Sequence, residues 1–229
     1  MKNKIGIIIA YVLIVIVCGV IIGGFIYQDY YMPEKIYNRN IMKVVEVKVS
    51  DDGETWGYAT GCFIDNQGTI LTNKHVVYNS NTLSNYKLIQ VRLASEEEFI
   101  SATVKNISND YDLATIKIDY KNSSFYKFNS CISNGQTVYT IGNPNGFGLS
   151  FTSGVVSSSD RNIIYNDQTI NAIQTDFVIN EGNSGGPVFN KYGELVGLIS
   201  FRIKDKIGDV IQGVSFAIPV ESILKFLEE

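Results

Sequence analysis

Residues 60–77 read TGCFIDNQGTILTNKHVV, and this stretch is the most informative for the fold of the chain. Two apolar runs flank Asp65–Gly68, which has the composition of a tight turn. We therefore expect a β-hairpin, with His75 just after its second strand.

Similar short runs occur at residues 43–49, 88–93, 102–107, 137–141, 154–158, 171–174 and 194–201. Turn residues separate them, and helical periodicity is absent until Pro219, after which Val220, Ile223, Leu224 and Leu227 recur at helical spacing. This pattern predicts an all-β barrel or sandwich that ends in one amphipathic helix.

Residues 182–187 read GNSGGP and surround Ser184 with glycines. A serine hydroxyl is a poor nucleophile at neutral pH and needs an adjacent base. His75 is the only histidine of the chain, so a histidine base for Ser184 can only be His75. The alternatives are a serine in an ordinary glycine-rich turn and a structural histidine at a strand end.

A carboxylate that orients His75 would complete this set, and residues 110–118 read DYDLATIKI. Asp110 and Asp112 point to the same side of an extended segment, so both are candidates.

These pieces together resemble the trypsin-like serine proteases, and most closely the high-temperature-requirement (HtrA/Deg) branch. The shared motifs are the Gly61–Val77 stretch, Asp-Leu-Ala at 112–114, Ile-Gly-Asn-Pro at 141–144 and Gly-Asn-Ser-Gly-Gly at 182–186. Their order is that of the chymotrypsin family, and the resemblance runs from about Val44 to the C-terminus.

The resemblance implies an all-β fold, a chymotrypsin-like double β-barrel of two six-stranded barrels with a C-terminal helix. It implies a catalytic set of His75, Asp112 and Ser184, since Asp112 stands at the family's Asp-Leu-Ala position. Gly182, Asn183 and Ser184 would form the oxyanion hole, with the N–H groups of Gly182 and Ser184 as donors. The sequence ends with this helix, so we expect the PDZ domain common in this family to be absent.

Two departures from digestive trypsins matter. Asn183 stands where those enzymes have an aspartate that pairs with a freed N-terminal amine, so this activation route is not needed. Val178 stands where they have the aspartate that binds basic side chains. The expected substrate pocket comprises Val178, Ser200, Phe201, Arg202 and Ile203, and Gly213–Phe216 completes its wall. We expect small or aliphatic residues before the scissile bond, with an acidic preference as the alternative if Arg202 points inward.

Ile5–Tyr27 contains no charge and no proline and is long enough to span a membrane as a helix. It is longer than the apolar region of a typical signal peptide and lacks a small-x-small cleavage site at its end, so we expect an uncleaved anchor. A buried core helix is a weaker alternative. Basic residues flank both ends, and the resemblance places the protease outside the cytoplasm.

The expected organisation is a cytoplasmic tail and transmembrane anchor at 1–28, a tether at 29–40, a first barrel at 41–125 and a second barrel with the C-terminal helix at 126–229. The localisation expected is a single-pass cell-membrane protein. The sequence does not define the oligomeric state.

Composition argues against several other classes. The net charge is −4 and no cluster of Lys and Arg is interleaved with aromatics, so a nucleic-acid partner is not expected. One histidine and three separated cysteines give no metal site, and no cofactor is expected. We expect Cys62 and Cys131 to be buried thiols, with a disulfide between them as the alternative.

The sequence thus predicts a membrane-anchored serine endopeptidase that cleaves unfolded or exposed protein segments. The alternatives are a catalytically idle protein-binding module on the same fold, and an esterase.

Overall fold

The computed structural model describes residues 2–165, 168–204 and 210–229. The chain divides into two units, residues 1–39 and 40–229. The first unit is almost all of α1 (Lys2–Asn40), and its segment Lys4–Gly24 has a mean hydropathy of 3.3, so its length and composition would allow it to cross a membrane. Helix α1 includes Pro33 and continues over residues 29–40, which the sequence predicted as a polar tether. That stretch contains no glycine, and its charged residues are compatible with a helix.

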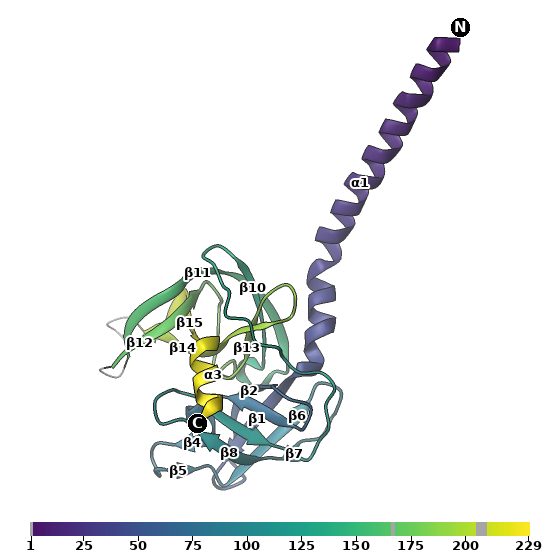
Figure 1. Cartoon of the computed structure of the whole chain (residues 1–229). Coiled ribbons are helices and arrows are strands. Elements are labelled where there is room, and N and C mark those ends of the chain that lie inside the picture. The colour runs from purple at the N-terminus through teal and green to yellow at the C-terminus, as the bar shows by residue number, and fades with distance from the viewer. Residues whose placement is uncertain (1, 166–167, 205–209) are drawn as a thin grey trace. The chain divides into compact units, whose positions relative to one another are not determined.

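The second unit begins with a short 3₁₀ turn η1 (Ile41–Lys43) and a seven-stranded antiparallel sheet (Figure 1). The strand order is β7-β6-β1-β2-β3-β9-β8. These strands are β1 (Val44–Ser50), β2 (Gly57–Phe63), β3 (Thr69–Thr72), β6 (Leu88–Leu93), β7 (Ile100–Ser101), β8 (Thr103–Ile107) and β9 (Ala114–Lys117). Helix α2 (Lys74–Val77) and the small pair β4 (Tyr78–Asn79) and β5 (Ser84–Asn85) follow β3.

This first sheet curls back on itself. Its two edge strands, β7 and β8, are consecutive in the chain and are separated only by Ala102, whose N–H donates to the carbonyl of Ile89 at 2.8 Å. Taken together, β7 and β8 form one bent strand that closes the barrel, which reconciles seven strands with the six that the family resemblance implied.

The expected hairpin at 60–77 is confirmed, with Cys62 opposite Leu71 and Phe63 opposite Ile70. Its turn is held by Asp65, whose Oδ1 accepts the N–H groups of Gln67 at 2.8 Å and Thr69 at 3.0 Å. Gly68 has φ +85° and lies against the carbonyls of Ile118 and Tyr120, where a side chain has no room.

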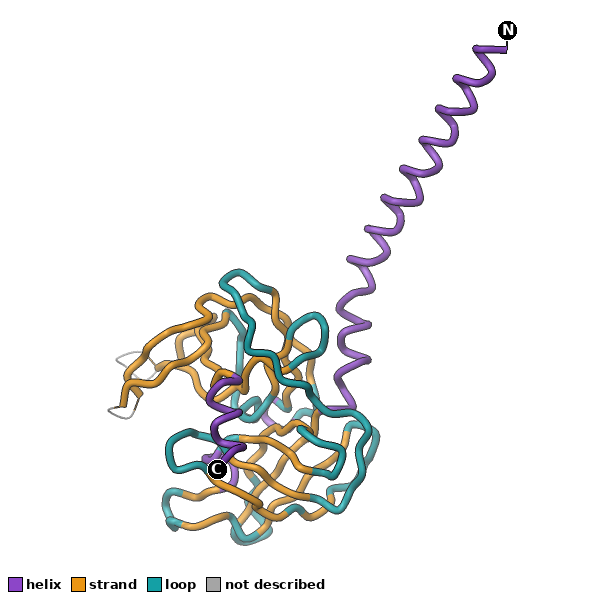
Figure 2. The backbone as a smooth tube through the Cα atoms, viewed as in Figure 1, coloured by secondary structure: helices purple, strands orange, loops and turns teal. Residues whose placement is uncertain are grey.

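The second body is a closed six-stranded barrel with the order β10-β11-β12-β15-β14-β13. Figure 2 shows the strands gathered in two bodies, joined by the loop-rich segment between β9 and β10. The elements are β10 (Thr137–Gly142), η2 (Pro144–Gly146), β11 (Ser150–Tyr165), β12 (Gln168–Thr175), β13 (Pro187–Phe189), β14 (Leu195–Lys204), β15 (Val210–Pro219) and α3 (Val220–Glu228).

Each body has its own apolar core. The first core collects inward residues of β1, β2, β3, β6 and β9, among them Val47, Phe63 and Ile116. The second collects residues such as Val138, Val188 and Ile199, and α3 buries Val220, Ile223 and Phe226. The predicted fold class, an all-β chymotrypsin-like fold with a C-terminal helix after an N-terminal apolar helix, is confirmed.

The cysteines differ from the expectation. Cys62 is buried as predicted, but Cys131 is exposed, and both are free thiols. Cys62 is fully buried on β2, whereas Cys131 lies on the surface, so the two thiols are not paired.

Candidate active site

The end of β3 positions His75. All four residues of β3 are buried, and the strand leads through Asn73 into α2, where His75 occupies the first turn. The buried Asn73 side chain donates from Nδ2 to the carbonyl of Asp112 at 2.9 Å, which ties the end of β3 to the loop before β9. His75 and Asp112 are therefore brought together by the pairing of β3 with β9.

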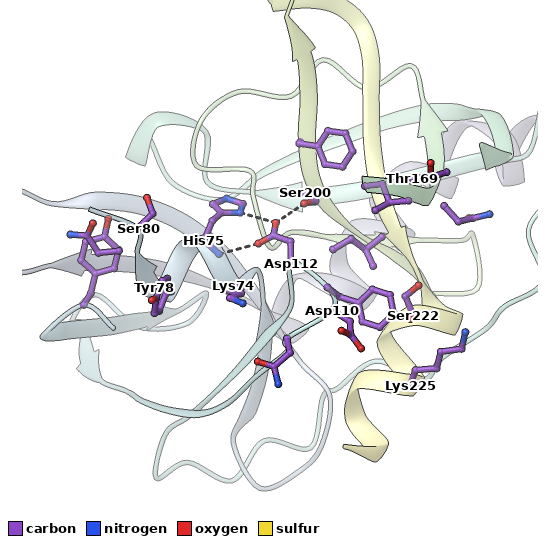
Figure 3. A pocket seen from close by; sticks show the side chains of 18 of the residues that line it. Lys74, His75, Tyr78, Ser80, Asp110, Asp112, Thr169, Ser200, Ser222 and Lys225 are labelled. Atoms are coloured by element: carbon purple, nitrogen blue, oxygen red, sulfur yellow. Dashed lines mark hydrogen bonds and ion pairs between the residues drawn. The ribbon is translucent and has the colours of Figure 1, made fainter. Parts of the chain in front are cut away.

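The Asp112 carboxylate accepts three hydrogen bonds (Figure 3). Oδ1 accepts the backbone N–H of His75 at 3.0 Å, and Oδ2 accepts His75 Nδ1 at 2.7 Å. The hydroxyl of Ser200, in β14, donates to Oδ2 at 2.6 Å. A carboxylate only accepts, so Nδ1 carries the proton and Nε2 of the neutral ring is left as the acceptor.

Two opposing effects act on the His75 pKa. Burial disfavours the charged ring, whereas the hydrogen bond and the negative charge of Asp112 favour it. The effect of Asp112 prevails, and the pKa of His75 is raised above its usual 6.5.

Asp110, the other candidate carboxylate, lies away from the ring of His75. Its backbone N–H donates to Ser108 Oγ at 3.3 Å, and its side chain lines the cavity drawn in Figure 3 without reaching the ring of His75. Of the two aspartates, Asp112 is the one that the fold pairs with His75.

Ser184 lies in the turn before β13, between Gly182 (φ +93°) and Gly185 (φ +81°). Its Oγ donates to the carbonyl of Ser200 over 3.5 Å, and it shares a cavity of about 450 Å³ with His75. Among the described residues the Ser184 hydroxyl makes no hydrogen bond to His75, and rotation about the Cα–Cβ bond of Ser184 would be needed to turn it from the Ser200 carbonyl. Hydrogen bonds between catalytic groups are often long or misaligned in unliganded sites.

Two peptide units around Ser184 have a fixed orientation. The carbonyl of Glu181 accepts the N–H of Asn145 at 2.7 Å, and the carbonyl of Asn183 accepts the N–H of Gly186 at 2.9 Å. No peptide bond among the described residues is cis, so the N–H groups of Gly182 and Ser184 point away from those carbonyls. The N–H of Asn183 is used within the turn, by the carbonyl of Asn180 at 3.1 Å.

Gly182 has no room for a side chain. A Cβ atom at this position would collide with the carbonyl oxygen of Asn143. The positive φ has the same consequence, because residues with a Cβ rarely adopt it.

Thr60, on β2, holds the Ser184 turn from the first barrel. Its N–H donates to the carbonyl of Ser184 at 2.9 Å, and its Oγ1 donates to the carbonyl of Gly182 at 2.7 Å. The same Oγ1 accepts the N–H of Asn143 at 2.9 Å, and the carbonyl of Thr60 accepts the hydroxyl of Thr72 at 2.8 Å. Every polar group of this fully buried residue is therefore used.

The expected substrate pocket is described in part. Val178 is 56% exposed between the buried Phe177 and Ile179. Phe201 stacks on Phe216, with 5.2 Å between ring centroids, and lines a cavity of about 1020 Å³ together with Ser200. The side chains of Arg202 and Ile203 lie outside the part of the chain that the structure describes.

Three contacts of this site were not predicted from the sequence. Ser200 lines the larger cavity beside Phe201, as expected of a pocket residue, but the hydrogen bond from its hydroxyl to Asp112 was not foreseen. The sequence also did not single out Thr60 or Asn73, whose partners lie 122 and 39 residues away in the chain. No local pattern marks such residues, because their roles come from contacts between distant segments.

The family described as "Trypsin-like peptidase domain" matches residues 59–198, and this chain belongs to that family. Within the family, the chain falls in the HtrA branch. It is 38% identical to "Serine protease HTRA2, mitochondrial" of Drosophila virilis over 74% of this chain and 38% of the relative. It is 36% identical to the Drosophila erecta protein of the same name over 74% of this chain and 38% of the relative.

Solved structures give the same result. "HtrA-type protease AlgW with tripeptide" superposes with a TM-score of 0.74 at 29% identity, covering 86% of this chain and 62% of that one. The serine endoprotease from Yersinia pestis superposes with a TM-score of 0.69 at 30% identity, covering 86% and 65%. The chain spans about two fifths of the length of the curated relatives it matches.

Proposed function

We propose that the chain is a serine endopeptidase in which Ser184 is the nucleophile, His75 the general base and acid, and Asp112 the group that orients His75. The observation that carries the proposal is the hydrogen-bonded set of Ser200, Asp112 and His75 beside a cavity that also contains Ser184. Asp112 holds the proton on Nδ1, so Nε2 is available to take the proton of Ser184.

The reaction then proceeds in two balanced halves. Ser184 Oγ attacks the peptide carbonyl while its proton moves to Nε2, and collapse of the tetrahedral adduct breaks the C–N bond as Nε2 returns that proton to the leaving amine. Water then attacks the acyl-enzyme ester by the same route, which releases the acid and restores the Ser184 hydroxyl.

The N–H groups of Gly182 and Ser184 would stabilise the oxyanion of each tetrahedral adduct. The orientation of the Glu181–Gly182 and Asn183–Ser184 peptide units supports this role, because their carbonyls are occupied on the opposite side. Asn183 carries no charge, so this arrangement would not depend on an ion pair with a new N-terminus.

The substrate would be an extended segment of a protein. A relative of known structure is described with a tripeptide, and the Val178 position offers no negative charge for a basic side chain. Small or aliphatic residues before the scissile bond are proposed because Phe201 supplies an apolar wall to the larger cavity.

Labelling with a fluorophosphonate probe tests the enzyme assignment. Wild type should react, and Ser184→Ala should lose both labelling and peptide hydrolysis, the latter by about 10⁴-fold or more. Ser95→Ala removes an exposed hydroxyl outside both cavities and is the matched control. A wild-type protein that binds peptides without labelling or cleavage would be the idle binding module, and faster turnover of esters than of any peptide would favour the esterase.

We also propose that Ile5–Tyr27 anchors the protein in the cell membrane with the protease on the extracytoplasmic side. The domain division proposed with it is 1–28, 29–40, 41–125 and 126–229. The apolar segment Lys4–Gly24 and the length of α1 support the anchor. Full-length protein should stay with membranes in carbonate, whereas Val15→Lys combined with Ile16→Lys should release it. A mature protein that begins after Tyr27 would show that the segment is a cleaved signal.

A further inference from the structure

A second cavity beside Ser184 has walls of distinctive composition. It has a volume of about 450 Å³, and His75, Gly182 and Ser184 line one side of it. Trp56, just before β2, and Tyr58, within it, line another part. The rest of the wall includes Val49, Ala59, Val76, Tyr86 and Asn145. Ser200 and Phe201 belong to the other, larger cavity.

Each of the two cavities can be assigned to one half of a peptide substrate, on one or the other side of the scissile bond. The inference rests on the proposed function, and it assigns the acyl half of the peptide to the larger cavity, which is lined by Ser200 and Phe201 of the expected substrate pocket. The chain of a peptide substrate continues through the reacting carbonyl to the leaving amine, which must lie within reach of His75 Nε2. The residues after the scissile bond therefore leave through the smaller cavity.

Neighbouring groups hold both aromatic rings in place. Trp56 donates from Nε1 to the carbonyl of Gly53 at 3.1 Å, and the ammonium of Lys48 lies 4.2 Å from the indole centroid. The ring of Tyr58 covers Gly146, where an added Cβ would lie 3.0 Å from the ring. Rings fixed in this way lose little conformational freedom when a ligand binds.

Charged groups at this cavity affect which substrate side chains it can accept. Glu181 lines it and is the acidic residue closest in sequence to Ser184. On the Glu181 side of the cavity a carboxylate of the substrate would meet a like charge, whereas the Lys48 ammonium lies at the Trp56 ring. A large apolar side chain would bury its surface against the two rings without that penalty.

We propose that Trp56 and Tyr58 form a subsite for a large aliphatic or aromatic residue on the C-terminal side of the scissile bond. Burial of one such side chain should raise kcat/KM by about 10- to 100-fold over a glycine at the same position.

The test uses full-length protein and quenched peptides with one fixed acyl half. The two residues after the scissile bond are varied in turn among Phe, Leu, Gly, Lys and Asp. We expect Phe or Leu to exceed Gly at one of these positions, and Asp to fall below Gly. Trp56→Ala should reduce the Phe-to-Gly ratio of kcat/KM to within about threefold of one, and Tyr58→Ala should reduce it in the same direction.

A second measurement isolates the leaving side. After acylation by an ester substrate, added amino-acid amides compete with water for the acyl-enzyme. Phenylalaninamide should capture more acyl group than glycinamide in wild type, and Trp56→Ala should abolish the difference. Tyr192→Ala removes a ring that is 65% exposed and lies outside both cavities, so it should leave both ratios unchanged.

The outcomes separate the inference from the proposed function. Three results would overturn the subsite alone, in a protein that is labelled and hydrolyses peptides. They are no preference after the scissile bond, a preference for Lys or Asp there, and a preference that Trp56→Ala leaves intact. Absence of both fluorophosphonate labelling and hydrolysis would overturn the proposed function and the subsite with it.

Discussion

Replacing Thr60 by valine should damage the proposed oxyanion hole from the opposite barrel. The change keeps the volume and the backbone hydrogen bond to the carbonyl of Ser184. It removes the hydroxyl that donates to the carbonyl of Gly182 at 2.7 Å and accepts the N–H of Asn143 at 2.9 Å. Both of these groups belong to buried residues and would be left without a partner.

The size of the effect follows from those two groups. A buried polar group that loses its partner costs about 1–3 kcal/mol, so the upper bound for the free energy of unfolding is a loss of about 2–6 kcal/mol. Movement of the Gly182 carbonyl towards another donor would lower the cost, but it would also turn the peptide unit that follows Gly182 and shift Ser184. Misplacing one oxyanion donor lowers kcat by about 10²- to 10³-fold. We expect kcat to fall by about 100-fold, with KM changed little.

The assay combines steady-state kinetics on a peptide with urea unfolding. Thr60→Ser keeps the hydroxyl and should stay within a few-fold of wild type in kcat. Leu93→Ala removes a buried side chain of β6 and costs about 2–5 kcal/mol of stability, so it controls for destabilisation alone. If Thr60→Val loses stability as Leu93→Ala does but keeps its kcat, the hydroxyl joins the two bodies without positioning the oxyanion donors.

Three further predictions concern His75, the aspartates and the thiols. Since Asp112 raises the pKa of His75, the protonated form persists to higher pH, so kcat/KM should rise with a midpoint above 6.5 in a profile from pH 5 to 9; a midpoint at or below 6.5 would contradict the raised pKa. Asp112→Asn should lower kcat by about 10⁴-fold, whereas Asp110→Asn should stay within about tenfold, and the reverse order would exclude Asp112 as the orienting group. Burial raises the pKa of the Cys62 thiol, so a thiol reagent should modify Cys131 in the native protein and Cys62 only after unfolding, as mass spectrometry of the labelled peptides would show.

The raised pKa of His75 also affects the free energy of unfolding. A histidine whose pKa is higher in the folded than in the unfolded protein stabilises the fold below its unfolded value, about 6.5. That contribution disappears as the pH rises through the raised folded value. The most active form of the proposed enzyme is therefore the one in which His75 no longer adds to stability.

Much of the fold was accessible from local patterns. The hairpin at 60–77 followed from turn residues between two apolar runs, and β6 has the bounds of the strand-like run predicted at 88–93. The length of β11 was underestimated, since the run at 154–158 is only the middle of a strand that extends from Ser150 to Tyr165. Register shifts around Ser158 interrupt its pairing with β12, and such irregularities hide the continuity of a strand in the sequence.

The sequence by itself determined which groups could react. The chain has a single histidine, one serine within a glycine-rich turn, and two aspartates just before a predicted strand. These left few possible sets of nucleophile, base and orienting carboxylate, and the order of the motifs reduced the number further. The tertiary structure brought Asp112, and not Asp110, into hydrogen-bond contact with His75. It also bonded the Ser200 hydroxyl to the Asp112 carboxylate and joined Thr60 of the first barrel to the Ser184 turn. The physical reason is that reactivity is a property of single side chains, whereas alignment depends on hydrogen bonds between segments that are distant in the chain and meet only when both barrels have folded.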